Sequence, residues 1–359
     1  MAVISYSEAM LNGILGKFTV PKGQYTFQPM TSGLINDTFL VSQSNSPLFV
    51  LQRINHAVFE NVSGLMLNIE QALAHLHDAN YTQLNLVKTV EGATFYSSEK
   101  EPSSHWRLMS FLDHTRTFDN APDETVAFEA GRIIGKFHVL LQNADPGTYI
   151  DTIPRFHDLT LREVQFNTAL KSANPNRLAD AHTSISFAKE TIAKLNAMHI
   201  DTLPVRVCHN DTKLNNILFS VKTQKALCLI DLDTLMAGNF MYDFGDAVRT
   251  IANTAPEDEQ DHNKITFNMT LFEAFVKGLA SNGKFLSKKE LQSLSTGVVL
   301  MPFLHGLRAL TDYLENDRYY KVNYENQNLD RALSLFNFTE KALYELNHVR
   351  TIIAGILND

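Results

Sequence analysis

The sequence predicts an α+β fold in two parts. Residues 1–112 are expected to form a small five-stranded antiparallel sheet with a helix, and residues 113–359 a larger, mainly helical part. Short segments rich in strand-forming residues gather in the first part. Apolar residues at helical spacing dominate the second. The length of 359 residues also exceeds what one small core requires, which favours two compact lobes.

The composition excludes several classes of function. The chain is 44% hydrophobic and 19% charged, with a net charge of −8 and no sustained Lys/Arg stripe, so a nucleic-acid partner is not expected. Cys208 and Cys228 are the only cysteines, and the second lies in an apolar segment, which favours reduced thiols and a cytoplasmic protein. We find no apolar run of membrane-spanning length and no signal peptide, so no membrane partner is expected.

The elements of the first part follow one another closely. An amphipathic helix is expected near the N-terminus, followed by strands at 25–30, 38–42 and 48–54. A helix is predicted between residues 58 and 79 from the spacing of its apolar positions. Further strand segments at 84–87, 94–96 and 106–112 complete the predicted sheet.

Helices dominate the second part. Helical segments are predicted near 119–141, 178–198 and 262–358. The segment 156–162 is a polar stretch containing aromatic residues, which suits either a substrate contact or a simple joint between a loop and a helix. Asp243 and Asp246 open a further helix, and we expect Asp246 to be structural.

A polar cluster is expected around a short hairpin. The strands 217–220 and 226–230 flank a polar link, and a turn at Thr223–Gln224 would place Asn216 opposite Asp231. Asp211 lies on the loop that leads into the hairpin. One carboxamide and two carboxylates would therefore converge, and such oxygen ligands suit Mg²⁺. Phosphoryl transfer uses this set, with one Asp for the acceptor hydroxyl and an Asn and a second Asp for the metal.

The stretch His209-Asn-Asp211-x₄-Asn216, followed by Ile230-Asp231-Leu-Asp233, resembles the catalytic and metal-binding segments of the aminoglycoside phosphotransferase and choline kinase group. The resemblance implies a bilobal protein-kinase-like fold and a small-molecule kinase that uses ATP and Mg²⁺. It makes Asp211 the catalytic base, with Asn216 and Asp231 as metal ligands. His209 is expected to brace the loop.

The same resemblance implies a nucleotide site in the first part of the chain. Glu70 on the predicted helix could orient the base of the third strand, although a solvated helix face explains it equally well. In the usual register of this fold, the position of the basic residue is occupied here by Gln52, and Arg53 is next to it. Because side chains alternate along a strand, Gln52 and Arg53 point to opposite faces. Because an amide cannot neutralise phosphates, we expect Arg53 or another nearby base to supply the charge. The remaining candidates are Ser32, Gly33 and Asn36 for the phosphates, and Met109 and Phe111 for adenine.

Three segments resemble the N-acetylhexosamine 1-kinases: 50–55, the loop 208–216 with 230–234, and 306–314. This resemblance implies phosphorylation of the anomeric hydroxyl of GlcNAc or GalNAc. Arg308 and Asp312, one helical turn apart, could present a charged pair to the sugar, or could simply form a salt bridge within the helix. Asp233 is a further candidate contact. A kinase for choline or an aminoglycoside, and a nucleotide-binding regulator without catalysis, remain alternatives.

Overall fold

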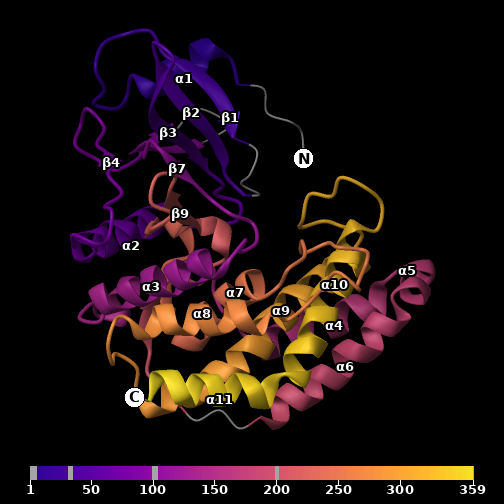
Figure 1. Ribbon diagram of the computed structural model, residues 1–359. Coiled ribbons are helices and arrows are strands. Elements are labelled where there is room, and N and C mark those ends of the chain that lie inside the picture. Colours follow the sequence, from indigo (N-terminus) through magenta and orange to yellow (C-terminus); the bar gives the residue numbers. More distant parts are fainter. Residues whose placement is uncertain (1–5, 31–34, 99–103, 199–201, 359) are drawn as a thin grey trace. The chain divides into compact units, whose positions relative to one another are not determined.

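The computed structural model describes residues 6–30, 35–98, 104–198 and 202–358. The chain separates into two compact units, residues 1–115 and 116–359. The first contains an antiparallel sheet and the second is mainly helical, so the predicted α+β class is confirmed (Figure 1).

Each of the six segments predicted as strands contributes a strand to the sheet of the first unit, although the sheet was expected to have five strands. In the described part of the chain it has six strands, in the order β1-β2-β3-β6-β4, with β5 also paired to β6. β4 pairs with residues 108–109 of β6 and β5 with residues 104–106, so two short strands share one edge of β6. The strands are β1 (Thr26–Met30), β2 (Asp37–Gln43), β3 (Ser46–Ile54), β4 (Leu86–Val87), β5 (Tyr96–Ser98) and β6 (Ser104–Ser110).

One face of this sheet packs on the helix α1 (Glu8–Leu15). Leu51, Trp106 and Leu108 belong to the same buried cluster as Leu11 and Leu15 of that helix. The other helix of the unit, α2 (Val62–His75), begins at Asn61, whose side chain accepts a hydrogen bond from the N–H of Gly64. Because side chains alternate along a strand, Gln52 and Arg107 lie on the face opposite the α1 cluster.

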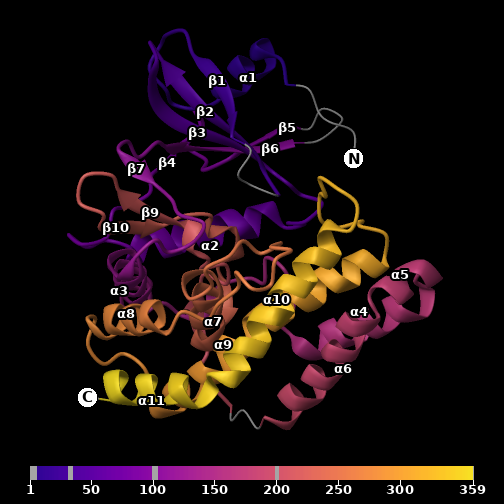
Figure 2. The same cartoon turned by 45° about the vertical axis from the view of Figure 1, so that its right-hand side comes forward.

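The second unit is built on helices packed in pairs. α7 packs on α9, α3 on α8, and α10 on α9 (Figure 2). Its helices are α3 (Glu124–Leu140), α4 (Leu159–Ser172), α5 (Pro175–Asp180), α6 (His182–Ala197), α7 (Phe240–Ile251), α8 (Met269–Ala280), α9 (Lys288–Leu314), α10 (Gln327–Tyr344) and α11 (Leu346–Leu357), with 3₁₀ turns η1 (Pro146–Thr148), η2 (Leu214–Asn216) and η3 (Leu232–Thr234). Short strands complete it: β8 (Arg206–Cys208) pairs with β11 (Met236–Gly238), and β9 (Ile217–Ser220) lies between β10 (Ala226–Leu229) and β7 (Thr115–Arg116).

Two glycines allow α7 and α9 to pack closely. A Cβ at Gly245 of α7 would overlap the carbonyl of Gly297 on α9, and a Cβ at Gly297 would overlap the carbonyl of Met241. The backbones therefore touch, which fixes α7 and the acidic residues at its start against the core of the unit.

α9 is long and apolar enough by composition to cross a membrane, although no apolar run of that length was recognised in the sequence. In the structure, 78% of its most apolar window is buried within the protein. Packing against α7 and α10 accounts for its apolar character, as expected of a core helix.

The predicted register of the β9–β10 hairpin is wrong by two residues next to the turn and by one residue at the open end. Ala226 pairs with Phe219 instead of Val221, and after a bulge at Leu227 the pair at the open end is Leu229 with Ile217 instead of Leu218. Ile230, rather than Asp231, therefore lies opposite Asn216, and its N–H donates to the carbonyl of Asn216 at 2.8 Å. Asp231 is the first residue beyond the hairpin and has a left-handed backbone, with φ of 61°.

Candidate active site

The loop between β8 and β9 is held by one buried carboxylate. Asp243, near the start of α7, accepts the backbone N–H of His209 at 2.8 Å and of Asn210 at 2.7 Å. His138 of α3 lies 2.9 Å from the same carboxylate. Asn210 has a φ of 62°, so these bonds support a backbone conformation that is uncommon outside glycine. The loop is thus fixed from two helices.

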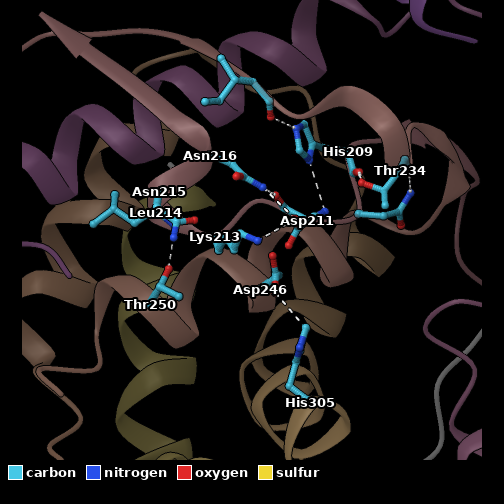
Figure 3. Close-up of polar contacts among 12 residues, drawn as sticks. His209, Asp211, Lys213, Leu214, Asn215, Asn216, Thr234, Asp246, Thr250 and His305 are labelled. Atoms are coloured by element: carbon cyan, nitrogen blue, oxygen red, sulfur yellow. Dashed lines mark hydrogen bonds and ion pairs between the residues drawn. The ribbon is translucent and has the colours of Figure 1, made fainter. Parts of the chain in front are cut away.

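His209 fixes the other side of the loop (Figure 3). Its Nδ1 accepts the N–H of Asp211 at 3.2 Å, so the opposite ring nitrogen, Nε2, donates to the carbonyl of Ile230 at 2.9 Å. One side chain therefore connects the residue before Asp231 to Asp211. This is the bracing role that the sequence suggested for His209.

Asp211 has two side-chain neighbours on its own loop. Nδ2 of Asn216 donates to Oδ2 and to the backbone carbonyl of Asp211, each at 2.8 Å. Nζ of Lys213 lies 3.1 Å from the same Oδ2. Figure 3 shows the three side chains pointing toward one another. Lys213 was overlooked in the sequence, where its place two residues after Asp211 was the available signal.

The charges in this cluster favour an ionised Asp211. Burial raises the pKa of Asp211, but Lys213, with His209 and Arg249, lowers it below its ordinary value. Burial likewise disfavours the ammonium of Lys213, whereas Asp211 and then Asp231 raise its pKa above the ordinary value.

The donors present fit a hard cation. Nδ2 of Asn216 is bound to Asp211, so its other side-chain atom, the oxygen Oδ1, is the atom suited to a metal. Asp231 is exposed and adds a carboxylate just beyond the hairpin. Oxygen ligands in this number suit Mg²⁺, which fills its shell with water and phosphate oxygens.

A second group of potential metal ligands, His138, Cys208 and Asp243, has another explanation. Both carboxylate oxygens of Asp243 accept hydrogen bonds from the loop. Burial raises the pKa of the Cys208 thiol well above its ordinary value, so the thiol stays protonated. This group is a structural support for the catalytic loop.

A second buried carboxylate faces Asp211. Nε of Arg249 donates to Oδ1 of Asp246 at 2.6 Å, and Nε2 of His305 lies 3.2 Å from the same oxygen. Burial raises the pKa of Asp246, but Arg249 and His305 hold it far below the ordinary range. Oδ2 of Asp246 has no hydrogen-bond partner among the described residues. The ion pair with Arg249 supports the structural role expected for Asp246.

The predicted pairing of Arg308 with Asp312 is wrong. Asp312 accepts the backbone N–H groups of Tyr319 at 2.7 Å and Tyr320 at 2.9 Å, and also a side-chain N–H of Asn328. It therefore holds the loop that follows α9 and is only 4% exposed, so it is not a substrate contact. The i, i+4 spacing is visible in the sequence, but these competing N–H donors are not.

Arg308 lies instead among aromatic rings. Its guanidinium carbon is 5.0 Å from the ring centre of Phe156, 5.8 Å from that of Tyr319 and 5.9 Å from that of Tyr320. Two of these rings belong to the loop that Asp312 holds. The neighbouring His157 is buried and bonds through Nε2 to the carbonyl of Asn210, the residue before Asp211, at 3.0 Å. The segment 156–162 therefore adjoins the catalytic loop.

The nucleotide candidates of the first unit have mixed outcomes. Ser32 and Gly33 lie outside the described residues. Oδ1 of Asn36 accepts the N–H of Asn55 at 3.0 Å, which ties the start of β2 to the end of β3. Met109 and Phe111 are half-buried in and just after β6, and their contact with adenine stays a prediction.

Two of these candidates form polar contacts within the first unit. Glu70 accepts a hydrogen bond from the Thr94 hydroxyl and lies 3.8 Å from Nζ of Lys88, so it does not orient the third strand. Arg53 lies on the α1 face of the sheet, where Nη1 contacts Asp37 at 3.1 Å. Arg53 and Gln52 therefore lie on opposite faces of the sheet, and which of them is on the side of the nucleotide phosphates stays a prediction.

Comparison with known proteins defines the family. Residues 26–269 match the model of the phosphotransferase enzyme family, so the chain belongs to it. Among solved structures, the fold is similar to an aminoglycoside phosphotransferase from Alicyclobacillus acidocaldarius, with a TM-score of 0.63, 14% identity and 99% of each chain covered. It is also similar to a choline kinase from Cryptosporidium parvum, with a TM-score of 0.61, 14% identity and coverage of 98% of this chain and 100% of that one.

A third similar structure contains a nucleotide analogue. It is the amicoumacin kinase hAmiN in complex with AMP-PNP, with a TM-score of 0.58 and 13% identity, covering 95% of this chain and 94% of that chain. Together these findings identify a member of the phosphotransferase enzyme family with a kinase-like fold.

Proposed function

We propose that this protein is an ATP- and Mg²⁺-dependent kinase that phosphorylates the anomeric hydroxyl of an N-acetylhexosamine, giving the sugar 1-phosphate. The observation that carries the kinase chemistry is the joining of Asp211 to Asn216 at 2.8 Å, with Lys213 at 3.1 Å. An acceptor base and a candidate metal ligand thus share one rigid loop, as in-line phosphoryl transfer requires.

Each residue of the loop has a defined task in this proposal. Asp211 accepts the hydrogen bond of the acceptor hydroxyl and orients it for attack. Lys213 keeps Asp211 ionised and adds positive charge beside the transferred phosphoryl group. Asn216 and Asp231 would hold Mg²⁺, which supplies charge neutralisation to the phosphates when bound.

The surroundings of Arg308 support an uncharged, oxygen-rich acceptor. Arg162 donates to Oε1 of Gln165 and to the carbonyl of Phe156, and among the described residues neither Arg162 nor Arg308 forms an ion pair with a carboxylate. Burial, and then the charge of Arg308, lower the pKa of Arg162 to about 10, so the two guanidinium groups influence each other. Such a pair repels a cationic acceptor such as choline, whereas sugar hydroxyl and carbonyl oxygens accept its hydrogen bonds.

The aromatic rings of Phe156, Tyr319 and Tyr320 lie beside Arg308 and suit the apolar face of a sugar ring. Asp233, which is buried in η3, is retained as a proposed sugar contact. The sugar identity rests on the three segments that resemble the N-acetylhexosamine 1-kinases. Both cysteines are free and buried, which supports our proposal of a reduced cytoplasmic location.

A panel of acceptors tests this function. ATP consumption is measured with GlcNAc, GalNAc, glucose, choline, aminopropanol and an aminoglycoside, and the product is examined by phosphorus NMR. We expect turnover with the N-acetylhexosamines and a phosphorus signal coupled to the anomeric proton. Activity confined to the cationic acceptors would overturn the sugar assignment. Nucleotide binding without turnover of any acceptor would favour the non-catalytic regulator.

A further inference from the structure

The third strand of the nucleotide-binding sheet lacks a positive charge at its key position. Kinases of this fold use a basic residue there to hold the nucleotide phosphates. In this chain the position is Gln52, and its carboxamide is neutral. A polyphosphate bound on this face therefore needs a cation from another strand.

The adjacent strand supplies one. Gln52 of β3 pairs directly with Arg107 of β6, so both side chains lie on the same face. Oε1 of Gln52 accepts Nε of Arg107 at 2.9 Å and Nη2 at 2.7 Å. Nε2 of Gln52 donates to Oγ1 of Thr38 on β2 at 3.1 Å. Gln52 is thus held in place by Thr38 of β2. Its carboxamide oxygen in turn orients the Arg107 guanidinium by binding Nε and Nη2, which lie on one edge of that group.

Arg53 does not compete for this role. Arg53 and Arg107 are the only lysine or arginine residues on the described strands of this sheet. Arg53 lies on the opposite face, where Asp37 pairs with it and Tyr6 donates to the same carboxylate oxygen at 2.5 Å. Arg107 is 2% exposed and ordered by its neighbours, so its charge stands at a fixed place beside the usual position of the base.

We propose that Arg107 supplies the cation for the nucleotide phosphates, with Gln52 as its positioning residue. The positive charge expected on β3 is then supplied by the neighbouring strand β6. A guanidinium offers paired N–H donors that match phosphate oxygens, and charge-assisted bonds of this kind are stronger than neutral ones. The inference rests on the proposed function only in its use of a nucleotide, and not on the identity of the acceptor.

Nucleotide binding without an acceptor tests the proposal. Dissociation constants for ATP and for adenosine are measured by calorimetry with the full chain and its variants. We expect Arg107→Gln to weaken ATP binding by roughly tenfold to a hundredfold. Adenosine, which has no phosphate, should bind as it does to the wild type. Arg53→Gln, the matched change on the other face, should leave ATP affinity unchanged.

A relocated charge gives a stronger test. In the double variant Gln52→Lys/Arg107→Gln the cation returns to the third strand, and we expect ATP affinity to recover relative to Arg107→Gln. Thermal unfolding verifies the fold. If Arg107→Gln does not fold, Arg107→Lys takes its place; losing the paired donors, it should weaken ATP binding but not adenosine binding.

Equal losses for ATP and adenosine, or unchanged ATP affinity in a folded Arg107→Gln protein, would overturn the role of Arg107. A wild-type protein that binds ATP but does not phosphorylate a sugar would refute only the proposed acceptor. The two failures are therefore distinguishable.

Discussion

Asn216 donates its side-chain N–H groups to both Oδ2 and the backbone carbonyl of Asp211, each at 2.8 Å. The catalytic candidate and the metal-ligand candidate are therefore mechanically coupled. Because both donors of Asn216 point to Asp211, its carboxamide oxygen is directed to the other side. A change in either residue should disturb acceptor activation and metal binding together.

The first prediction concerns Asp211. Asp211→Asn should lower kcat by about 10²–10⁴-fold, because the amide cannot accept the proton of the acceptor hydroxyl. Acceptor binding, measured by calorimetry, should change little. Asp119→Asn alters an exposed acid whose Oδ1 bonds Asn215 of the same loop, and it serves as the control with near wild-type kcat. Equal activity of the Asp211 and Asp119 variants would refute the assignment.

The second prediction concerns the metal. Asp231→Asn should nearly abolish turnover at ordinary Mg²⁺, since the exposed carboxylate beyond the hairpin is lost as a ligand. The dependence of the rate on Mg²⁺ concentration should also move to higher concentrations. Asp119→Asn again provides the comparison. Wild-type activity and an unchanged Mg²⁺ dependence in Asp231→Asn would contradict the metal assignment.

The third prediction uses pH to test Lys213. Because Lys213 lowers the pKa of Asp211, Lys213→Met should raise that pKa. The acid limb of the kcat/KM profile should then lie at higher pH, so that activity is lost earlier as the pH falls. Lys213→Arg retains the charge and should keep the limb near its original place. An acid limb that stays fixed in Lys213→Met would show that Asp211 is not the group responsible for it.

The fourth prediction concerns the loop beyond α9. Asp312→Ala removes the acceptor for the N–H groups of Tyr319 and Tyr320, so the aromatic rings beside Arg308 should lose their fixed positions. We expect a higher KM for the acceptor, an unchanged KM for ATP, and a loss of stability of about 1–3 kcal/mol for the unpaired buried groups. Arg308→Ala should raise the acceptor KM with a smaller loss of stability. A higher KM for ATP in Asp312→Ala would contradict this role.

The fifth prediction concerns stability in mild acid. Burial lowers the pKa of His157 and of His305 to about 4, so both are neutral in the folded protein at neutral pH. Between about pH 6.5 and pH 4 the unfolded chain binds protons at these positions and the folded chain does not, so stability falls as the pH falls. Each can contribute on the order of 3 kcal/mol across that window.

Thermal unfolding at closely spaced pH values measures this effect. His305→Gln should show a smaller decline in Tm between pH 6.5 and pH 4 than the wild type. The carboxyl groups of Asp246 and Glu257, whose pKa values their arginine partners depress, produce a separate loss below about pH 4. A wild-type Tm that is constant from pH 6.5 to pH 4 would contradict the prediction.

The sequence by itself determined the α+β class and predicted that the side chains of Asp211 and Asn216 lie together. These depend on hydrophobic period and on groups close together in the chain, such as Asp211 and Asn216, which are five residues apart. Short separation leaves the backbone few ways to keep such groups apart. The resemblance of the loop to the phosphotransferases agrees with the family match.

Tertiary structure decided which partner each remaining polar side chain has. Glu70 bonds Thr94, 24 residues away, and Gln52 bonds Arg107, 55 residues away, and no local spacing specifies either contact. The position of the turn and the bulge at Leu227 together left the open end of the hairpin one residue out of the predicted register. Asp312 accepts backbone N–H groups instead of pairing with Arg308, because a buried carboxylate needs hydrogen-bond donors. Only the folded chain determines which donors can reach it.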